Sequence, residues 1–469
     1  MKRTSPVVML GFHELSPVLM DQFIAEGKLP NFARMKSESQ VYITEAQEIA
    51  PNLEPWIQWV TVDTGLSYKQ HGIFDLAEEG RLGYPRVDEI LSQSGRKVWI
   101  CGSMNASFRT PPNGFFLPDP WSVGVDPYPK GEFEGFFHYV RRNVQESSRE
   151  RMGRSKTDHL KFLAFMVRHG FSAKSITAII NQLAQERSGK FRWKRAAILD
   201  RLQWDVFEHY WRHHSPDYST FFIQSTANFQ HLYWRNMDPS PFRIKPSVEE
   251  QAEYKDAVPF GYQSMDRIVG ECLEKLGRDT VVILASGLSQ QPCLVPDDKG
   301  RTFYRANDPE EFFAFAGVKS QYRYAPLLSE KFHLYFKDEP GAIEAERLLR
   351  ALKRGDRELM SVRRDGQEVI GGCAIFTQED REAIVTAANG DAKPFGRLLF
   401  QMNGLKSGVY HPDGVLWIRD TTKKPTPSQR VSLRQVAPTI LAHFGLPKPE
   451  FMKMDALPGY SVEHTPVHA

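Results

Sequence analysis

The sequence predicts an α/β protein with a doubly wound, mostly parallel sheet, a helical insertion and a small α+β insertion. Three observations carry this prediction. Short apolar runs rich in β-branched residues recur along the chain, and helical patterns of apolar residues lie between several of them. Polar loops follow these runs directly, as they do at the carboxyl ends of buried parallel strands. The length of 469 residues allows one large α/β domain with insertions, or two to three ordinary domains.

The strands and helices can be taken in chain order. "VVMLGF" near the N-terminus predicts a buried strand, and "PVLMDQFIAEG" after it predicts a helix. "KVWICGS" (Lys97 to Ser103) and "STFFIQST" (Ser219 to Thr226) predict two more strands. The helical pattern "QSMDRIVGECLEKLG" precedes "TVVILAS" (Thr280 to Ser286), which predicts a further strand. The loop up to Gln291 would then follow the carboxyl end of this strand. This alternation is typical of a doubly wound sheet.

Two stretches interrupt the alternation. From about Phe133 to His214 the pattern is helical, and Tyr139 to His214 holds 16 Lys and Arg against 7 Asp and Glu, although the whole chain has a net charge of only +3. From about Arg301 to Leu398 the pattern predicts strand, helix, strand, strand. The predicted division is therefore a core in three parts (1–130, 215–300 and 399–469), a basic helical insertion acting as a cap (131–214) and a small α+β insertion (301–398).

The composition is that of an ordinary soluble globular protein. No apolar run approaches the roughly 18 residues that a membrane-spanning helix needs, and "MKRTSPVVMLGF" leaves no room for a signal peptide before the first strand. The four cysteines lack paired spacing and zinc-finger partners, so we expect reduced core thiols in a cytoplasmic protein without a membrane partner. "RSGKFRWKR" interleaves basic and aromatic residues, but a nucleic-acid partner is not expected from so short a signal.

Three further segments, in this order and spacing, carry a resemblance. They are "GFHELSPVLMDQFIAEGKLPNFARM" (Gly11 to Met35), "WVTVDTGLSYKQHGIFD" (Trp59 to Asp75) and "VAPTILAHFGLPKP" (Val436 to Pro449). Together they resemble the alkaline phosphatase superfamily, in particular its type I phosphodiesterase/nucleotide pyrophosphatase branch. The resemblance covers the core and neither insertion. It implies an alkaline phosphatase-like fold with two metal ions, usually zinc, held at strand ends, and a Thr or Ser nucleophile between them.

The residues at the matching positions depart from that set. The first ligand Asp falls at His13, and the nucleophile falls near Glu54 in "PNLEPWIQW", where there is no Thr or Ser. In "ANFQH" the Asp position is Ala227, while the His is retained as His231. The "SDHG" pair falls on "SGLS", so both ligands are missing, and the late His is retained as His411 in "GVYHPDG". The sequence therefore predicts a degenerate site without the ordinary dinuclear mechanism, which needs several anionic ligands.

A polar set nevertheless remains at the predicted strand ends. We expect Glu54, His13 and Glu14 to be the catalytic groups, and His231 and His411 to share one divalent metal: zinc, or iron or manganese. The alternative for the two histidines is hydrogen bonding to nearby backbone or amides without any ion. The expected substrate-binding residues are polar or aromatic neighbours of these groups together with two basic residues of the insertion: Asn52, Trp56, Gln58, Asn228, Gln290, Gln291, Arg192 and Lys194.

The resemblance implies a hydrolase or group-transfer enzyme with a remodelled site. Its substrate would be a phosphate- or sulfate-bearing, or otherwise anionic, small molecule or glycoconjugate, which the basic insertion would attract. The alternative is an inactive member of the superfamily that binds a ligand or a partner protein. The sequence does not fix the oligomeric state.

Overall fold

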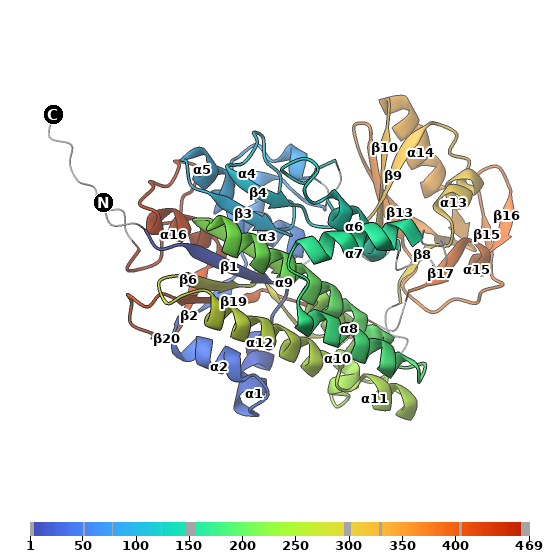
Figure 1. Ribbon diagram of the computed structural model, residues 1–469. Coiled ribbons are helices and arrows are strands. Elements are labelled where there is room, and N and C mark those ends of the chain that lie inside the picture. The colour runs from blue at the N-terminus through green and yellow to red at the C-terminus, as the bar shows by residue number, and fades with distance from the viewer. Residues whose placement is uncertain are drawn as a thin grey trace.

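The central feature of the computed structural model is a mixed sheet of eight strands in the order β20-β2-β19-β6-β1-β5-β3-β4. The structure describes residues 4–49, 52–76, 78–122, 124–146, 156–294, 302–327, 331–402 and 406–460. Strand β19 is antiparallel to both of its neighbours, and every other pair in this sheet is parallel. The prediction of a mostly parallel, doubly wound α/β sheet is confirmed (Figure 1).

The strands and helices have the following bounds. The strands of the eight-stranded sheet are β1 (Val7–Phe12), β2 (Gln40–Glu45), β3 (Val98–Cys101), β4 (Gly114–Leu117), β5 (Tyr218–Ile223), β6 (Val281–Ala285), β19 (Asp413–Arg419) and β20 (Thr426–Ser432). The helices around it are α1 (Pro17–Ala25), α2 (Pro30–Ser37), α3 (Pro55–Thr64), α4 (Tyr68–His71), η1 (Glu79–Arg81), α5 (Val87–Gln93), α10 (Ser225–Met237), α11 (Val248–Tyr254), α12 (Ala257–Lys275), η3 (Leu433–Gln435) and α16 (Val436–His443). Strands β7 (Ser289–Pro292) and β18 (Gly408–His411) form a separate antiparallel pair.

Strand β1 shows why helices cover both faces of the sheet. Its six residues are all buried, and alternate side chains point to opposite faces. Val8, Leu10 and Phe12 belong to one hydrophobic cluster, with α1, α2 and α12, whereas Val7 and Met9 belong to another, with α3, α5 and α16. A strand buried on both faces must be apolar throughout, and this is the pattern that made it recognisable in the sequence.

The basic insertion forms four helices and a 3₁₀ turn: α6 (Glu134–Glu146), α7 (Lys156–Arg168), α8 (Ala173–Glu186), η2 (Arg192–Lys194) and α9 (Arg195–His214). Its helical character is thus confirmed. Helix α9 contacts β3, β5 and α12, and its Trp204 and Phe207 belong to the main core. This helix therefore packs directly on the central sheet. That the insertion as a whole caps the site stays a prediction.

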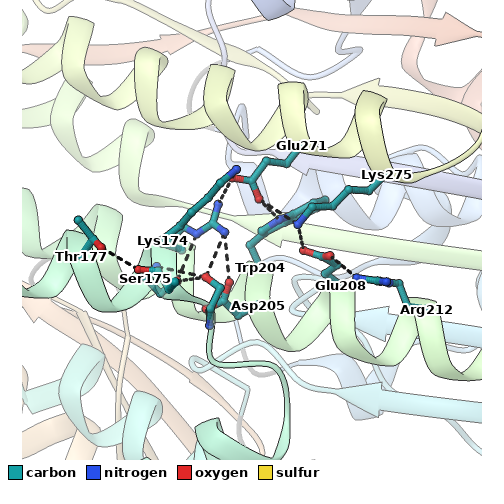
Figure 2. Close-up of polar contacts among 12 residues, drawn as sticks. Lys174, Ser175, Thr177, Trp204, Asp205, Glu208, Arg212, Glu271 and Lys275 are labelled. Atoms are coloured by element: carbon teal, nitrogen blue, oxygen red, sulfur yellow. Dashed lines mark hydrogen bonds and ion pairs between the residues drawn. The ribbon is translucent and has the colours of Figure 1, made fainter.

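Several basic residues of the insertion form ion pairs with acidic residues of the protein. Glu271 of α12 accepts hydrogen bonds from Lys174 (2.9 Å), Arg201 (2.7 Å) and the indole of Trp204 (3.1 Å), so that it joins α8 and α9 to α12 (Figure 2). Arg201 also pairs with Asp205 at 3.2 Å. These basic residues are therefore engaged in packing helices together and are not free to attract an anion.

The second insertion is a module beside the central sheet, drawn in orange in Figure 1. Its elements are β8 (Tyr304–Ala306), α13 (Pro309–Ala316), β9 (Tyr322–Pro326), β10 (Lys331–Phe336), α14 (Glu339–Arg350), β11 (Lys353–Arg354), β12 (Arg357–Glu358), β13 (Met360–Asp365), β14 (Glu368–Cys373), β15 (Ile384–Thr386), β16 (Ala392–Pro394), α15 (Phe395–Leu398) and β17 (Leu399–Gln401). A hydrophobic cluster of its own runs from Tyr304 to Leu399. The expected α+β character is confirmed, and the exact division of the chain into domains stays a prediction.

Two smaller expectations can be compared with the structure. None of the four cysteines, all of which lie in the described ranges, forms a disulfide bond, but Cys293 is partly exposed, so it is not the core thiol that the sequence predicted. The residues predicted as a polar loop after the strand at 280–286 form strand β7 from Ser289 onward, because they pair with β18. Among the described residues, no helix is long and apolar enough to cross a membrane.

Candidate functional site

Glu14 is the centre of the polar cluster at the carboxyl end of β1. Its side chain is 1% exposed, and its backbone has φ of +60°, a left-handed conformation that a glutamate adopts only at a cost. One carboxylate oxygen lies 2.8 Å from His13 Nε2, and the other lies 3.0 Å from His231 Nε2 and accepts from the Gln290 amide. The amide of Gln230 donates to its carbonyl oxygen at 2.9 Å. Four side chains thus fix this strained residue in place.

The hydrogen bonds assign protons to both histidines. His13 Nδ1 accepts from Trp59 Nε1 at 2.9 Å, so its proton is on Nε2 and points to Glu14. Both ring nitrogens of His231 face acceptors, because Nδ1 lies 3.1 Å from the Gly408 carbonyl oxygen. Both contacts are hydrogen bonds only if both nitrogens carry hydrogen, which favours an imidazolium–carboxylate pair.

The charge of Glu14 follows from these neighbours. Burial by itself would raise the pKa of the Glu14 carboxyl, but the charges and hydrogen bonds of His13 and His231 outweigh it and hold that pKa well below its usual range. Glu14 is therefore a permanent carboxylate to which three side chains already donate. It organises the cluster and is not available as a base, which differs from the catalytic role that the sequence suggested.

Glu54 is the group whose charge can change. It is the N-cap of α3, follows Leu53 in the segment where the superfamily has its nucleophile, and is only partly buried. Burial raises the pKa of the Glu54 carboxyl to about 7, against the opposing charges of Lys331 and Lys406 and with the help of Asp75 and Glu14. A carboxyl that titrates near neutral pH can act as a general base or acid there.

Two lysines from later parts of the chain lie near Glu54. Lys331, at the start of β10 in the module, has its ammonium 5.2 Å from the centroid of Trp56 and 3.5 Å from Asp75 Oδ1. Lys406, just before β18, has its ammonium 5.3 Å from the centroid of Tyr410, whose ring in turn contacts His231 edge-on at 5.4 Å. Glu54, the two lysines and the Glu14 cluster therefore gather at one edge of the sheet.

Apolar packing fills the place where the resemblance puts two metal ligands. Leu288 is fully buried and forms a small cluster with Ala46 and Leu53, against which Tyr410 packs. At Gly287, a Cβ atom would lie 3.2 Å from Gln58 Cβ, which is tighter than nearly all real contacts. The missing ligands are therefore replaced by hydrophobic contacts and a close backbone approach, and not by other polar groups.

The donor atoms present do not fit the metal ion that the resemblance implies. Both nitrogens of His231 are engaged as described above. His411 Nδ1 accepts from the Asp413 amide at 3.2 Å, and His411 follows Tyr410 on β18, so the two side chains point to opposite sides of the strand. Since Tyr410 faces His231, His411 points away from it. Within the described ranges, no three His, Cys, Asp or Glu side chains converge so as to hold a metal. Metal sharing by His231 and His411 stays a prediction, and no step below depends on it.

The expected substrate-binding residues fall into two groups. Trp56, Gln58 and Gln290 are buried in the cluster, and both amide atoms of Gln58 and the indole nitrogen of Trp56 lack a hydrogen-bond partner in the described part of the chain. Buried unpaired polar atoms are uncommon and require an explanation, such as a ligand or a water molecule. The second group consists of partly or largely exposed residues: Asn52, Asn228, Gln291, Arg192 and Lys194.

The exposure and contacts of three residues of the second group bear on their possible role in substrate binding. Gln291 is exposed, and its amide donates to the Tyr410 carbonyl at 3.4 Å. Asn228 is exposed on α10, three residues and so about one helical turn before His231. The Lys194 ammonium binds the Gln185 amide oxygen at 2.9 Å and lies over the rings of Phe191, Trp193 and Phe260. A direct role of these residues toward a substrate stays a prediction.

Sequence reasoning missed Lys331, Lys406 and Tyr410. Tyr410 and Lys406 precede the retained His411 by a few residues, so they could have been included as neighbours of a motif position. For Lys331 the sequence contains no such signal, since it belongs to the module that the resemblance does not cover.

The chain was compared with known proteins. No protein-family model and no curated protein sequence matches it. Similar solved structures include phosphonoacetate hydrolase from Sinorhizobium meliloti 1021 in complex with phosphonoformate, at 12% identity over 92% of this chain and 94% of that chain, with a TM-score of 0.43. Murine ectonucleotide pyrophosphatase / phosphodiesterase 5 in complex with AMP is 10% identical over 95% and 96%, with a TM-score of 0.42. A mutant of alkaline phosphatase PafA is 11% identical over 97% and 99%, with a TM-score of 0.43. Each of these likenesses extends over more than nine tenths of both chains.

Proposed function

We propose that the chain is a hydrolase or group-transfer enzyme for an anionic, phosphate- or sulfate-bearing small molecule or glycoconjugate. The observation that carries this proposal is the position of Glu54, a carboxyl with a pKa of about 7, between Lys331 and Lys406 at the carboxyl edge of the sheet. Two cations near one titratable carboxyl suit an anionic group and its attack by water. The solved structures named above contain phosphonoformate and AMP, which are anions of this kind.

The chemistry proceeds without a nucleophilic hydroxyl. Glu54 in its ionised form takes a proton from a water molecule, and the oxygen of that water forms a bond to the phosphorus or sulfur atom. The ester bond to the leaving oxygen breaks, and Glu54 returns the proton to this oxygen. Lys331 and Lys406 stabilise the negative charge that develops on the transferred group, while the Glu14–His231 pair holds the surrounding loops in place.

A panel of phosphate monoesters, phosphate diesters and sulfate esters tests the proposal. The wild type is expected to hydrolyse at least one class, and Glu54→Gln should abolish this turnover while retaining the binding of inorganic phosphate or sulfate measured by calorimetry. Lys331→Gln should weaken anion binding itself. Turnover that is unchanged in Glu54→Gln would refute the assigned base.

An inactive binding protein is the second candidate, and the packing around Leu288 favours it. An apolar cluster occupies the place of two metal ligands, and Glu14 already accepts from three side chains. In this case anions bind in a manner that depends on Lys331, and no ester of the panel is hydrolysed. The same two measurements therefore separate the candidates.

A further inference from the structure

Helices α7 and α8 of the basic insertion carry apolar side chains on faces that are open to solvent. The described ranges contain twelve exposed large hydrophobic side chains, and half of them lie on these two helices. Their exposed fractions range from 41% to 67%. We call this set the outer stripe: Leu160, Leu163 and Val167 on α7, and Ile176, Ile180 and Leu183 on α8.

Helix α7 is apolar on two opposite sides. On its inner side, Phe165 and Met166 are buried in the main hydrophobic cluster, and Phe162 packs against that cluster. Its three residues of the outer stripe are spaced three and four residues apart, so they share one face of the helix. Since an α-helix has 3.6 residues per turn, this face lies on the side turned away from the cluster.

Helix α8 repeats this arrangement directly after a short turn. Ser175 and Gln182 are buried on its inner side, and Ile179 packs against the same cluster as α7 does. Its part of the outer stripe points away from that inner side, by the same helical spacing. Only residues 169–172 separate the two helices, and within this turn the Phe171 amide donates to the Met166 carbonyl oxygen at 2.9 Å. Both parts of the outer stripe therefore face away from one core.

The exposure of the outer stripe indicates what kind of surface covers it. A helix that is apolar on all sides is normally buried, and clustered exposed apolar side chains mark an interaction site. Side chains exposed to this extent protrude from the helix and do not line a groove. A lipid bilayer accepts protruding aliphatic side chains at the boundary of its hydrocarbon region without any matching pocket.

The charges around the outer stripe favour an anionic surface. Both acidic residues between positions 156 and 190 are already paired, Asp158 with Arg142 at 2.7 Å and Glu186 with Arg195. A second copy of this face would therefore bring mostly like charges together, which is unfavourable. Four exposed basic residues of the same stretch form no ion pair with any described residue: Lys161, Arg168, Arg187 and Lys190.

We propose that the outer stripe binds the surface of an anionic lipid bilayer, with α7 and α8 lying in the plane of the interface. The aliphatic side chains enter the boundary between head groups and acyl chains, and the four unpaired basic side chains reach the lipid phosphates. A helix that lies on a membrane does not need the length of one that spans it. The expectation of no membrane partner, which came from the lack of a spanning run, therefore does not apply to this surface. The inference uses no residue of the candidate site and is independent of the proposed function.

Co-sedimentation of the full chain with lipid vesicles tests the proposal. The wild type should bind phosphatidylcholine vesicles that contain about one third phosphatidylserine at least tenfold more tightly than pure phosphatidylcholine vesicles. Leu163→Asn and Ile180→Asn should each weaken this binding about tenfold, because each removes an aliphatic side chain from the buried face. The double variant Lys161→Gln, Arg168→Gln should weaken binding to the anionic vesicles roughly thirtyfold and leave binding to neutral vesicles unchanged.

Two matched controls come from α14 in the module. Ile343→Asn removes an exposed isoleucine and Arg347→Gln an exposed arginine, and both variants should bind vesicles as the wild type does. The inference is overturned if the wild type does not bind the anionic vesicles at low salt, or if the stripe variants bind them as the controls do. A dimer in analytical ultracentrifugation that Ile180→Asn dissociates, without vesicle binding, would also overturn it, because a second copy would then cover the stripe. Unchanged far-ultraviolet circular dichroism of each variant confirms that the fold is intact.

Discussion

Replacing Glu54 by Gln should raise the free energy of unfolding relative to the wild type. This gain should be larger at alkaline pH than at acidic pH. The pKa of the Glu54 carboxyl is raised from 4.5 to about 7 in the folded chain. Between these two values the folded protein holds a proton that the unfolded chain has released. The stability that this group contributes is thus complete below pH 4.5 and is lost as the pH rises to about 7.

The magnitude follows from the width of that interval. Each pH unit within it corresponds to about 1.4 kcal/mol, so ionising Glu54 in the folded state costs about 3 kcal/mol by the time the pH exceeds 7. Glutamine has no proton to lose and escapes this cost. The difference in the free energy of unfolding between variant and wild type should therefore grow by about 2–3 kcal/mol from about pH 5 to about pH 8.

Urea titrations followed by tryptophan fluorescence at several pH values measure this difference. Glu450→Gln is the matched control, because Glu450 is exposed and far along the chain from the site, and its difference from the wild type should not vary with pH. Should the Glu54→Gln and control curves run parallel, or should the Glu54→Gln advantage be greatest at acidic pH, the assignment of a buried, neutral-pH carboxyl at Glu54 would be wrong.

Three further predictions concern the same region. Protein purified without chelators should hold less than one equivalent of zinc, iron or manganese by mass spectrometry, whereas one equivalent that disappears in both His231→Ala and His411→Ala would establish the shared metal ion. Bis-p-nitrophenyl phosphate with added zinc, manganese or magnesium should be hydrolysed no faster than in buffer, since losing a nucleophile costs several orders of magnitude; a phosphorylated Thr or Ser would contradict this. Leu288→Ala should lower the free energy of unfolding by about 2–5 kcal/mol, as for other fully buried leucines, and a change below about 1 kcal/mol in urea titrations would show that the cluster around it is loosely packed.

The sequence predicted the parts of the fold whose burial is complete. Strands β1, β3, β5 and β6 are buried on both faces, and their continuous apolar runs separate them from helices. Strand β20 escaped prediction because none of its residues is fully buried: its pattern "TPSQRVS" is mostly polar and exposed, and it is held by pairing with β2. Such a strand is recognisable only from its partner.

The sequence predicted the part of the candidate site whose residues follow directly after a strand. His13, Glu14 and His231 follow β1 or β5, so the parallel sheet brings them to one edge, and the structure places them in contact. The choice of partners was not predictable. His411 is separated from His231 by the alternation of β18, and Lys331 comes near Trp56 and Glu54 only because its side of β10 faces the core. Both depend on the relative placement of elements that no local pattern encodes.

The packing around Leu288 would resist the introduction of metal ligands at positions 287 and 288. An aspartate at position 287 would need space that Gln58 occupies, and a histidine at position 288 would replace a fully buried leucine in contact with Leu53. Each substitution alone would destabilise the fold, and neither alone would supply enough ligands for a metal ion. A metal site at these positions would therefore need several substitutions at once, and no single one of them would be favourable by itself.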